Sequence, residues 1–435
     1  MNELVYPTLD LFLYDLKEAL NATDEVTRNN QEIFTKKLPK DVQIIDRDIE
    51  SEYLELISPS RKDFEQDKEL DGYYYPVRLN DTYGLQISCS VINKNEPQSV
   101  KEFSHLKSEI EQRLNQQPIT LGQAWILSGW LPENSMQNYE EIAQDCYKYF
   151  SPNRNWQRDF QGEANFCGGK IFQLWQPQNE PTDSSNRLYL ENTPILIAIY
   201  PNAEIAQKAA EFYTDWMGLF SYVSKFNWAY AQSRLIKKNI FGYYKKVESD
   251  RQKISLQHRQ SLGHQLTASK QSLDHIQQDI KQYSSDLLGL AFQKQIIDIN
   301  LTNYQTRLEI IRQKLDGDNQ LEFLNKFVDL VNKKYLVQID KDSENMKLGF
   351  QLLQDNINTV RSRIELAKAE RDRNFQEFIA VVGAGVAGVN FASADKNCEP
   401  IFGKTSLFCK TPVLFSLLVF IIAAGLTWLI RRKWK

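Results

Sequence analysis

The chain has little of what metal sites and nucleic-acid binding require. Among 435 residues there are four histidines and five cysteines, and 52 Lys and Arg are balanced by 56 Asp and Glu. The histidines are scattered, so we expect no multi-histidine metal site. Without a basic excess to neutralise phosphates, we expect no nucleic-acid partner. No nucleophile is paired with a base, which predicts no catalytic residues and a protein that is not an enzyme.

The charges are distributed unevenly along the chain. Residues 1–200 hold 19 basic and 32 acidic side chains, 201–400 hold 27 and 24, and 401–435 hold six basic and none acidic. The net charge of −4 therefore averages an acidic N-terminal part, a nearly neutral middle and a basic end. This division predicts parts of different character rather than one uniform domain.

Residues 1–200 alternate strand-like and helix-like patterns. Tyr73 to Ile92, with Asn80-Asp81 at its middle, is typical of a β-hairpin. Interleaved strands and helices predict an α/β or α+β domain with a mixed sheet of about five to seven strands. The other elements expected here are helices over Val100–Leu114 and Asn138–Phe150, and strands over Thr120–Leu131, Gln161–Trp175 and Pro194–Tyr200.

From about Asn202 onward, glycine and proline nearly vanish and the pattern becomes helical. A helix is expected over about 203–247, and a 3,4 repeat of apolar residues runs from Leu262 to Leu315, over more than seven heptads. A second repeat begins at Phe350 and passes directly into an apolar segment at Phe378. We expect long antiparallel coiled-coil helices joined by a turn at 316–319, the last forming a stalk.

Two apolar segments near the C-terminus predict a transmembrane hairpin. Residues 412–430 contain no charge and are followed by a basic tail at 431–435, as in a transmembrane helix with a basic inner end. Phe378 to Ala392 is 15 residues long and reaches spanning length when extended to residue 394. No basic n-region precedes an apolar run at the N-terminus, so no secretory signal is expected. A single-span tail anchor is the alternative.

The first of these segments also contains a dinucleotide-binding pattern. Residues 383–388 read Gly-Ala-Gly-Val-Ala-Gly, but no strand, helix and acidic ribose-binding residue follow, so cofactor binding is rejected. Within a membrane helix the same small residues allow close helix packing. They either pack one helix on another or line a pore.

These observations give an expected fold class and domain plan. The fold class is an α+β membrane protein with an N-terminal α/β domain, long coiled-coil helices with a stalk, and a two-helix transmembrane hairpin. The expected parts are a cytoplasmic domain (1–200), a coiled-coil and stalk region (201–377), a first transmembrane helix (378–394), an outer loop (395–411), a second transmembrane helix (412–430) and a basic cytoplasmic tail (431–435).

Four residues near the expected membrane boundary have two interpretations each. Cys398 and Cys409 fall in the outer loop, where an oxidising compartment permits a disulfide; otherwise they remain thiols. Arg371 and Asn374 fall on the stalk seam, where polar residues set register or oligomer state, or they simply mark the membrane interface.

This layout resembles the CorA-type family of magnesium and divalent-cation channels. The family's Gly-Met-Asn signature at the outer end of the first span corresponds to Gly388-Val389-Asn390 here, with the methionine replaced. The resemblance implies a homopentamer in the inner membrane of a prokaryote, in contact with membrane lipid and with both termini in the cytoplasm. It implies no organic cofactor, and magnesium or a similar divalent cation as the transported ion. The replaced methionine puts magnesium selectivity in doubt.

The resemblance also implies roles for individual residues. Asn390 would form a ring of carbonyl oxygens at the pore mouth, and Asp395 and Glu399 would concentrate cations in front of it. Gly383, Gly385 and Gly388 would keep the pore wall thin. The resulting hypothesis is an oligomeric cation channel gated by a ligand at the N-terminal domain, with a membrane effector of prokaryotic defence as a variant. The alternative is a non-conducting, membrane-anchored coiled-coil scaffold or signalling protein.

Overall fold

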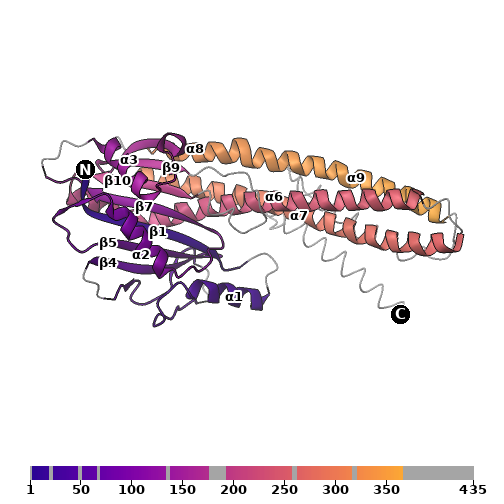
Figure 1. Ribbon diagram of the computed structural model, residues 1–435, viewed down its shortest axis with the longest axis horizontal. Helices are drawn as coiled ribbons and strands as arrows, with labels where there is room; N and C mark the ends of the chain where they lie inside the picture. Colours follow the sequence, from indigo (N-terminus) through magenta and orange to yellow (C-terminus); the bar gives the residue numbers. More distant parts are fainter. Residues whose placement is uncertain are drawn as a thin grey trace, which may run out of the picture. The chain divides into compact units, whose positions relative to one another are not determined.

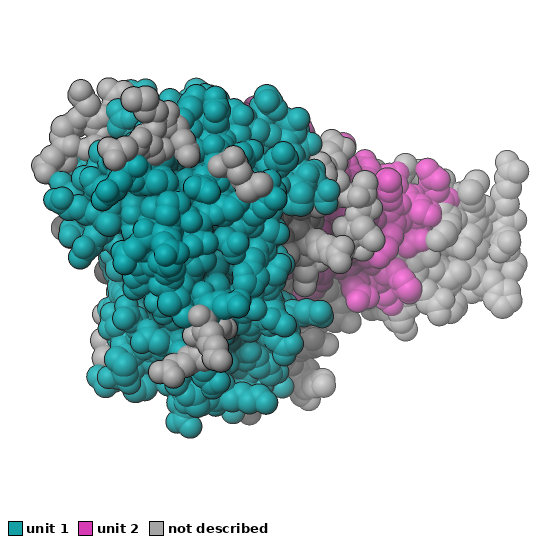
Figure 2. Space-filling model, turned by 60° about the vertical axis from the view of Figure 1, so that its left-hand side comes forward, with its two compact units in different colours: residues 1–231, 297–334 teal, residues 232–296, 335–435 magenta. Residues whose placement is uncertain are grey.

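The computed structural model describes residues 2–18, 23–47, 51–65, 69–133, 138–175, 193–256, 262–315 and 321–365 (Figure 1). The chain divides into two compact units, which Figure 2 colours separately. Unit 1 is Met1–Ala231 with Ile297–Lys334, and unit 2 is Gln232–Ile296 with Tyr335–Lys435.

Unit 1 contains all of the strands described, together with the shorter helices. The strands are β1 (Glu3–Leu16), β2 (Leu54–Glu55), β3 (Lys62–Asp63), β4 (Leu70–Leu79), β5 (Thr82–Val91), β6 (Pro97–Ser99), β7 (Gly122–Trp130), β8 (Phe160–Phe166), β9 (Gly169–Trp175) and β10 (Pro194–Tyr200). The helices of the two units are α1 (Asp24–Thr35), α2 (Glu102–Arg113), α3 (Tyr139–Phe150), α4 (Trp156–Asp159), α5 (Ala203–Ala210), α6 (Tyr213–Leu256), α7 (Leu262–Lys314), α8 (Phe323–Leu330), the π-helical η3 (Val331–Leu336) and α9 (Val337–Glu365).

The strands form one mixed sheet in the order β2-β4-β5-β1-β7-β10-β9-β8, with β3 paired to β4 and β6 to β1. Neighbours are antiparallel except for β7 and β10, which run parallel. The hairpin predicted over Tyr73–Ile92 is confirmed as β4 and β5. They are joined at Asn80-Asp81, where Asn80 has a φ of 54°, the conformation that a tight hairpin turn favours.

The first face of the sheet packs against α2 and α3. Alternate residues of β1, such as Leu9 and Leu11, are fully buried there, together with Phe103 and Leu106 of α2 and Ile142 of α3. This alternation places every second side chain of a strand on the same face. The helices predicted over Val100–Leu114 and Asn138–Phe150 are confirmed as α2 and α3.

The second face of the sheet is covered in part by the beginning of α6. The Phe12 ring lies 5.3 Å from that of Phe220, and the Tyr14 hydroxyl donates a 2.7 Å hydrogen bond to the Met217 carbonyl oxygen. β1 is therefore buried on both faces from Leu9 to Tyr14, which explains why that part of its sequence is apolar except at Asp10. Beyond Phe12, toward the start of β1, the second face becomes polar.

Unit 2 is built from the adjoining parts of α6, α7 and α9, which run side by side (Figure 1). The 3,4 repeat predicted in α7 is confirmed where side chains are described, because its apolar positions from Ile276 to Ile311 are buried. Tyr283 and Leu287 of α7 join Phe350 and Leu353 of α9 in one core. The predicted turn at 316–319 lies outside the described residues.

Two predictions about the sheet are wrong. We expected a sheet of about five to seven strands, whereas the sheet in the part of the chain that the structure describes has ten. Gln161–Trp175, predicted as one strand, forms two strands, β8 and β9, because the chain reverses at Cys167 and Gly168, both with positive φ. The pair Gly168-Gly169 is a hairpin turn signal in the sequence, and the prediction of one uninterrupted strand ignored it.

The predicted membrane fold class and inner-membrane localisation are also corrected. Of the helices in the described ranges, none is both long and apolar enough to cross a membrane. In α6 and α7 the apolar residues form a stripe with charged residues between them, as in helices that pack on protein. The predicted transmembrane helices at 378–394 and 412–430, the loop at 395–411 and the tail at 431–435 lie outside the described residues.

Candidate functional site

The residues predicted to form a pore, an outer loop or a stalk seam all lie outside the described residues, so these assignments stay predictions. They are Gly383, Gly385, Gly388, Asn390, Asp395, Glu399, Cys398, Cys409, Arg371 and Asn374. Within the described ranges, no group of three or more His, Cys, Asp or Glu side chains is placed to hold a metal ion.

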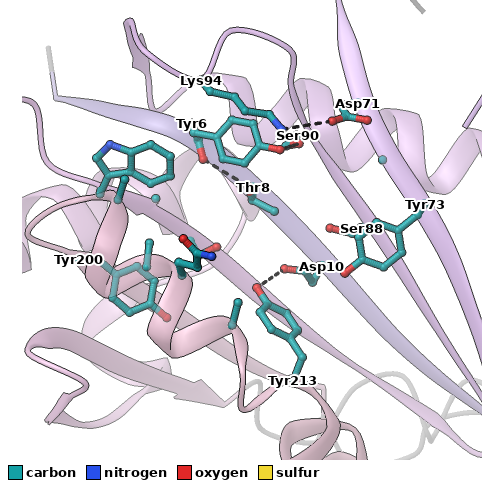
Figure 3. A pocket seen from close by; sticks show the side chains of 18 of the residues that line it. Tyr6, Thr8, Asp10, Asp71, Tyr73, Ser88, Ser90, Lys94, Tyr200 and Tyr213 are labelled. Atoms are coloured by element: carbon teal, nitrogen blue, oxygen red, sulfur yellow. Dashed lines mark hydrogen bonds and ion pairs between the residues drawn. The ribbon is translucent and has the colours of Figure 1, made fainter. Parts of the chain in front are cut away.

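A cavity of about 570 Å³ lies on the second face of the sheet in unit 1 (Figure 3). Its floor comes from β1, β4, β5 and β7, and α5 with the first residue of α6 forms one wall. Ala203, Ala206 and Ala210 of α5 line that wall. Their spacing places them on one helix face, and their small side chains leave the space open.

The floor of the cavity is polar because three strands each place polar residues on the same face. In the register of the sheet, Thr8 lies opposite Ser90, and Asp10 lies opposite Ser88. On the other side of β1, Thr8 lies opposite Ser128 of β7. Cross-strand neighbours on one face have side chains within contact distance, so these groups form one continuous polar surface.

Asp10 lies at the bottom of the cavity with 1% of its surface exposed. The Tyr213 hydroxyl donates a 2.7 Å hydrogen bond to its Oδ2 atom, and Gln86 Nε2 donates a 3.0 Å bond to Oδ1. Ser88 also hydrogen-bonds the carboxyl group. Burial raises the pKa of Asp10 above its usual 3.8, and these three hydrogen bonds oppose the increase.

Asp10 is one of five aspartates that are buried in the described residues, and it differs from the other four. Each of those pairs with Lys or Arg at N–O distances between 2.5 and 3.3 Å. No Lys, Arg or His of the described residues forms an ion pair with Asp10. The four paired groups are Asp15 with Lys37, Asp159 with Arg158, Asp215 with Arg307 and Lys314, and Asp342 with Arg234 and Lys237.

Three tyrosines of the cavity lining, Tyr73, Tyr200 and Tyr213, interact electrostatically with the carboxyl group of Asp10. Figure 3 shows Tyr213 and Tyr73 directing their hydroxyls toward it from two sides. Tyr200, 7% exposed, lines the same cavity, and its hydroxyl makes no hydrogen bond to any residue that the structure describes. Burial raises the pKa of all three tyrosines, and the charge of Asp10 adds to the effect. They are therefore neutral hydroxyl groups at neutral pH.

A bulge in β1 brings Tyr6 to the edge of the cavity. Tyr6 has a φ of 50°, and the register with β7 shifts between Val5 and Thr8. A bulge redirects a side chain in this way. The Tyr6 hydroxyl accepts a 2.9 Å hydrogen bond from Ser90 Oγ, and its ring lies 5.6 Å from that of Trp130. The cavity thus has an aromatic border above its polar floor.

The rim of the cavity carries charges of both signs. Arg61 lies 3.2 Å from Asp63, and Lys94 lies 3.8 Å from Asp71; all four side chains are at least half exposed. Arg61 also lies 5.3 Å from the Tyr73 ring centroid, and Lys94 lies 5.1 Å from that of Tyr6. The rim is therefore electrically balanced, whereas Asp10 is the one acidic group in the buried part of the cavity lining described here.

Comparisons with known protein families, with curated proteins and with solved structures found no match to this chain. The resemblance to the CorA-type family therefore stays a prediction.

One local feature of the sequence indicates this site. Asp10 stands between apolar residues in Leu9-Asp10-Leu11, and an acidic residue inside an apolar strand requires a buried partner or a function. Its partners Gln86 and Tyr213 are 76 and 203 residues away in the chain, so no local pattern joins them to Asp10.

Proposed function

We propose that unit 1 is a binding module for a small polar molecule, which occupies the cavity above Asp10. The observation that carries the proposal is a buried carboxyl group that lines a cavity and has only neutral hydrogen-bond donors around it. Asp10 forms no ion pair with any of the described residues, although Tyr213 and Gln86 donate hydrogen bonds to it. Buried charged groups are normally paired with a group of opposite charge.

The dimensions and lining of the cavity support the same proposal. Ligand sites are typically clefts of roughly 300–1,000 Å³ with aromatic walls and a few convergent polar groups. The cavity, at about 570 Å³, lies in this range. Its aromatic border, Tyr6 and Trp130, stands beside a floor that converges on Asp10.

The predicted ligand-gated channel had a binding part and a conducting part. The binding part placed a ligand at the N-terminal domain, and the cavity supports it. The conducting part depends on residues outside the described ranges and stays a prediction, as does the scaffold alternative.

Thermal unfolding of the full chain with a defined compound panel tests the proposal. The panel comprises amino acids, amines, sugars and nucleotides. At about 100 times the Kd, a ligand adds about 2.7 kcal/mol to the stability of the native state, which raises Tm by about 5 °C or more. We expect at least one compound class to do so. Ala206→Trp fills the cavity from the α5 wall, and we expect it to abolish the increase.

Glu204→Trp is the matched control. Glu204 lies on the same helix but is exposed and does not line the cavity, so this variant should respond as the unmodified chain does. The proposal fails if no compound raises Tm, or if the compounds act equally on Ala206→Trp.

A further inference from the structure

We propose that the ligand of this cavity is an organic cation, an amine whose positive charge pairs with Asp10 beside the hydroxyl groups of Tyr73 and Tyr213. This inference rests on the proposed binding function and names the ligand class. Its starting point is the comparison of the buried aspartates. Among the described residues, every buried aspartate other than Asp10 forms an ion pair with a Lys or Arg side chain.

Asp10 is the exception among the buried aspartates in two respects. It has no Lys or Arg partner in the described residues, and it lines the cavity described above. A buried carboxylate is costly unless a cation or several hydrogen bonds compensate it. Tyr213, Gln86 and Ser88 provide only neutral donors. A cation in the cavity would provide the charge that Lys37 provides to Asp15.

The aromatic residues around the cavity favour a cation independently of Asp10. Positive groups are attracted to the faces of tyrosine and tryptophan rings within about 6 Å of the ring centroid. Two rings of the lining already have such a neighbour at the rim, because Lys94 lies 5.1 Å from Tyr6 and Arg61 lies 5.3 Å from Tyr73. Tyr213 lies deeper and contacts Asp10 itself, and Tyr200 lines the same cavity farther from Asp10 (Figure 3).

The volume of the cavity and the side chains that line it favour an organic cation over a metal ion. A cavity of about 570 Å³ is many times the roughly 30 Å³ that one water molecule occupies. Calcium and magnesium prefer several carboxylate and carbonyl oxygens, whereas one buried carboxylate is present here. An organic ammonium ion provides both the charge and the volume, and its N–H groups can donate to Asp10 and to the unpartnered oxygen of Tyr200.

Calorimetric titration of the full chain with putrescine, spermidine and choline tests the inference. Magnesium chloride, potassium chloride and glucose serve as comparison solutes. We expect at least one of the three amines to bind and the comparison solutes to give no binding heat. Asp10→Asn should weaken amine binding by at least about 30-fold, because one member of a buried charge pair is lost.

Asp63→Asn is the matched control for loss of a carboxylate. Asp63 lines the rim, but its side chain is 67% exposed, so we expect a change of less than about threefold. Tyr213→Phe removes a hydrogen bond to Asp10 and leaves the charge, so its effect should be smaller than that of Asp10→Asn.

The results separate this inference from the proposed binding function. Equal amine affinity in Asp10→Asn and the unmodified chain overturns the cation assignment. If no amine binds but another compound class stabilises the unmodified chain and not Ala206→Trp, the cation assignment fails and the binding function stands. If nothing in either series binds, both fail.

Discussion

Asp10 and Asp15 show how two similar residues of one strand acquire different properties. Both are 1% exposed on β1. Asp15 accepts a hydrogen bond from Lys37 at 2.7 Å and one from the Thr120 amide at 2.9 Å, so its charge is compensated within the protein. Asp10 has neutral partners and faces a cavity. The first arrangement anchors α1 to the sheet, and the second leaves a carboxyl group whose charge is uncompensated in the folded chain.

This difference predicts a pH dependence of stability that belongs to Asp10. Its pKa is raised above 3.8 in the folded state, so folding favours the protonated form. The contribution is fully present below pH 3.8 and is lost as the pH rises through the folded pKa. Relative to Asp10→Asn, the unmodified chain should therefore lose stability as the pH rises from about 4 to 8.

Urea unfolding of both proteins across this range measures the effect. The titratable groups that interact with Asp10 are Tyr213 on α6, Tyr73 on β4 and Tyr200 on β10. Their raised pKa values keep these tyrosines neutral over this pH range. Gln86 and Ser88 do not titrate. A difference in unfolding free energy that stays constant with pH would contradict the prediction.

At the level of single residues, the sequence could show that Asp10 and Asp15 are unusual but not which has a partner. Both are acids within one apolar strand. Lys37, which decides the matter for Asp15, is 22 residues away, and Tyr213 is 203 residues from Asp10. Contacts at these separations depend on how the strands pair, and a local pattern carries no information about pairing.

At the scale of elements, the predictions that the structure confirms were based on local signals in the sequence. The Asn80-Asp81 turn, the amphipathic helices α2 and α3, and the 3,4 repeat of α7 each have a period or turn chemistry that can be recognised in the sequence. The arrangement of strands was not predictable in this way. β1 pairs with β5, β6 and β7, and very short strands such as β2 and β3 have no pattern of their own.

The seam of unit 2 gives a prediction at this scale. Leu287 of α7 is 1% exposed within the unit 2 core, whereas Leu348 of α9 is 60% exposed. Leu287→Ala should lower the free energy of unfolding by about 2–5 kcal/mol, because it removes buried methyl groups and leaves a cavity. Leu348→Ala should change it by about 0.5 kcal/mol or less. Urea unfolding followed by circular dichroism measures both, and equal effects would contradict the assigned helix faces.

At the scale of the whole molecule, the long helices serve two cores. Residues up to Ala231 of α6 and from Ile297 of α7 belong to unit 1. Within that unit, Phe220 packs under Phe12, and Phe327 of α8 stacks on Trp175 at 4.4 Å. The remaining parts of α6 and α7 form the separate core of unit 2 with α9. The repeats predicted the helices, but they could not predict which part of each helix contributes to which core.

The division into two units predicts which amides exchange more slowly when a ligand binds. The cavity lies entirely in unit 1, and Tyr213, which contacts Asp10, is the first residue of α6. With the tightest-binding amine present at saturation, amide hydrogen exchange should slow at residues 8–10, 86–90 and 213–217, because binding stabilises the closed state of the segments that hold the ligand. Exchange at residues 276–290 should stay unchanged, because those amides belong to the other core. Slower exchange there would contradict independent units and would mean that α6 and α7 transmit the binding event.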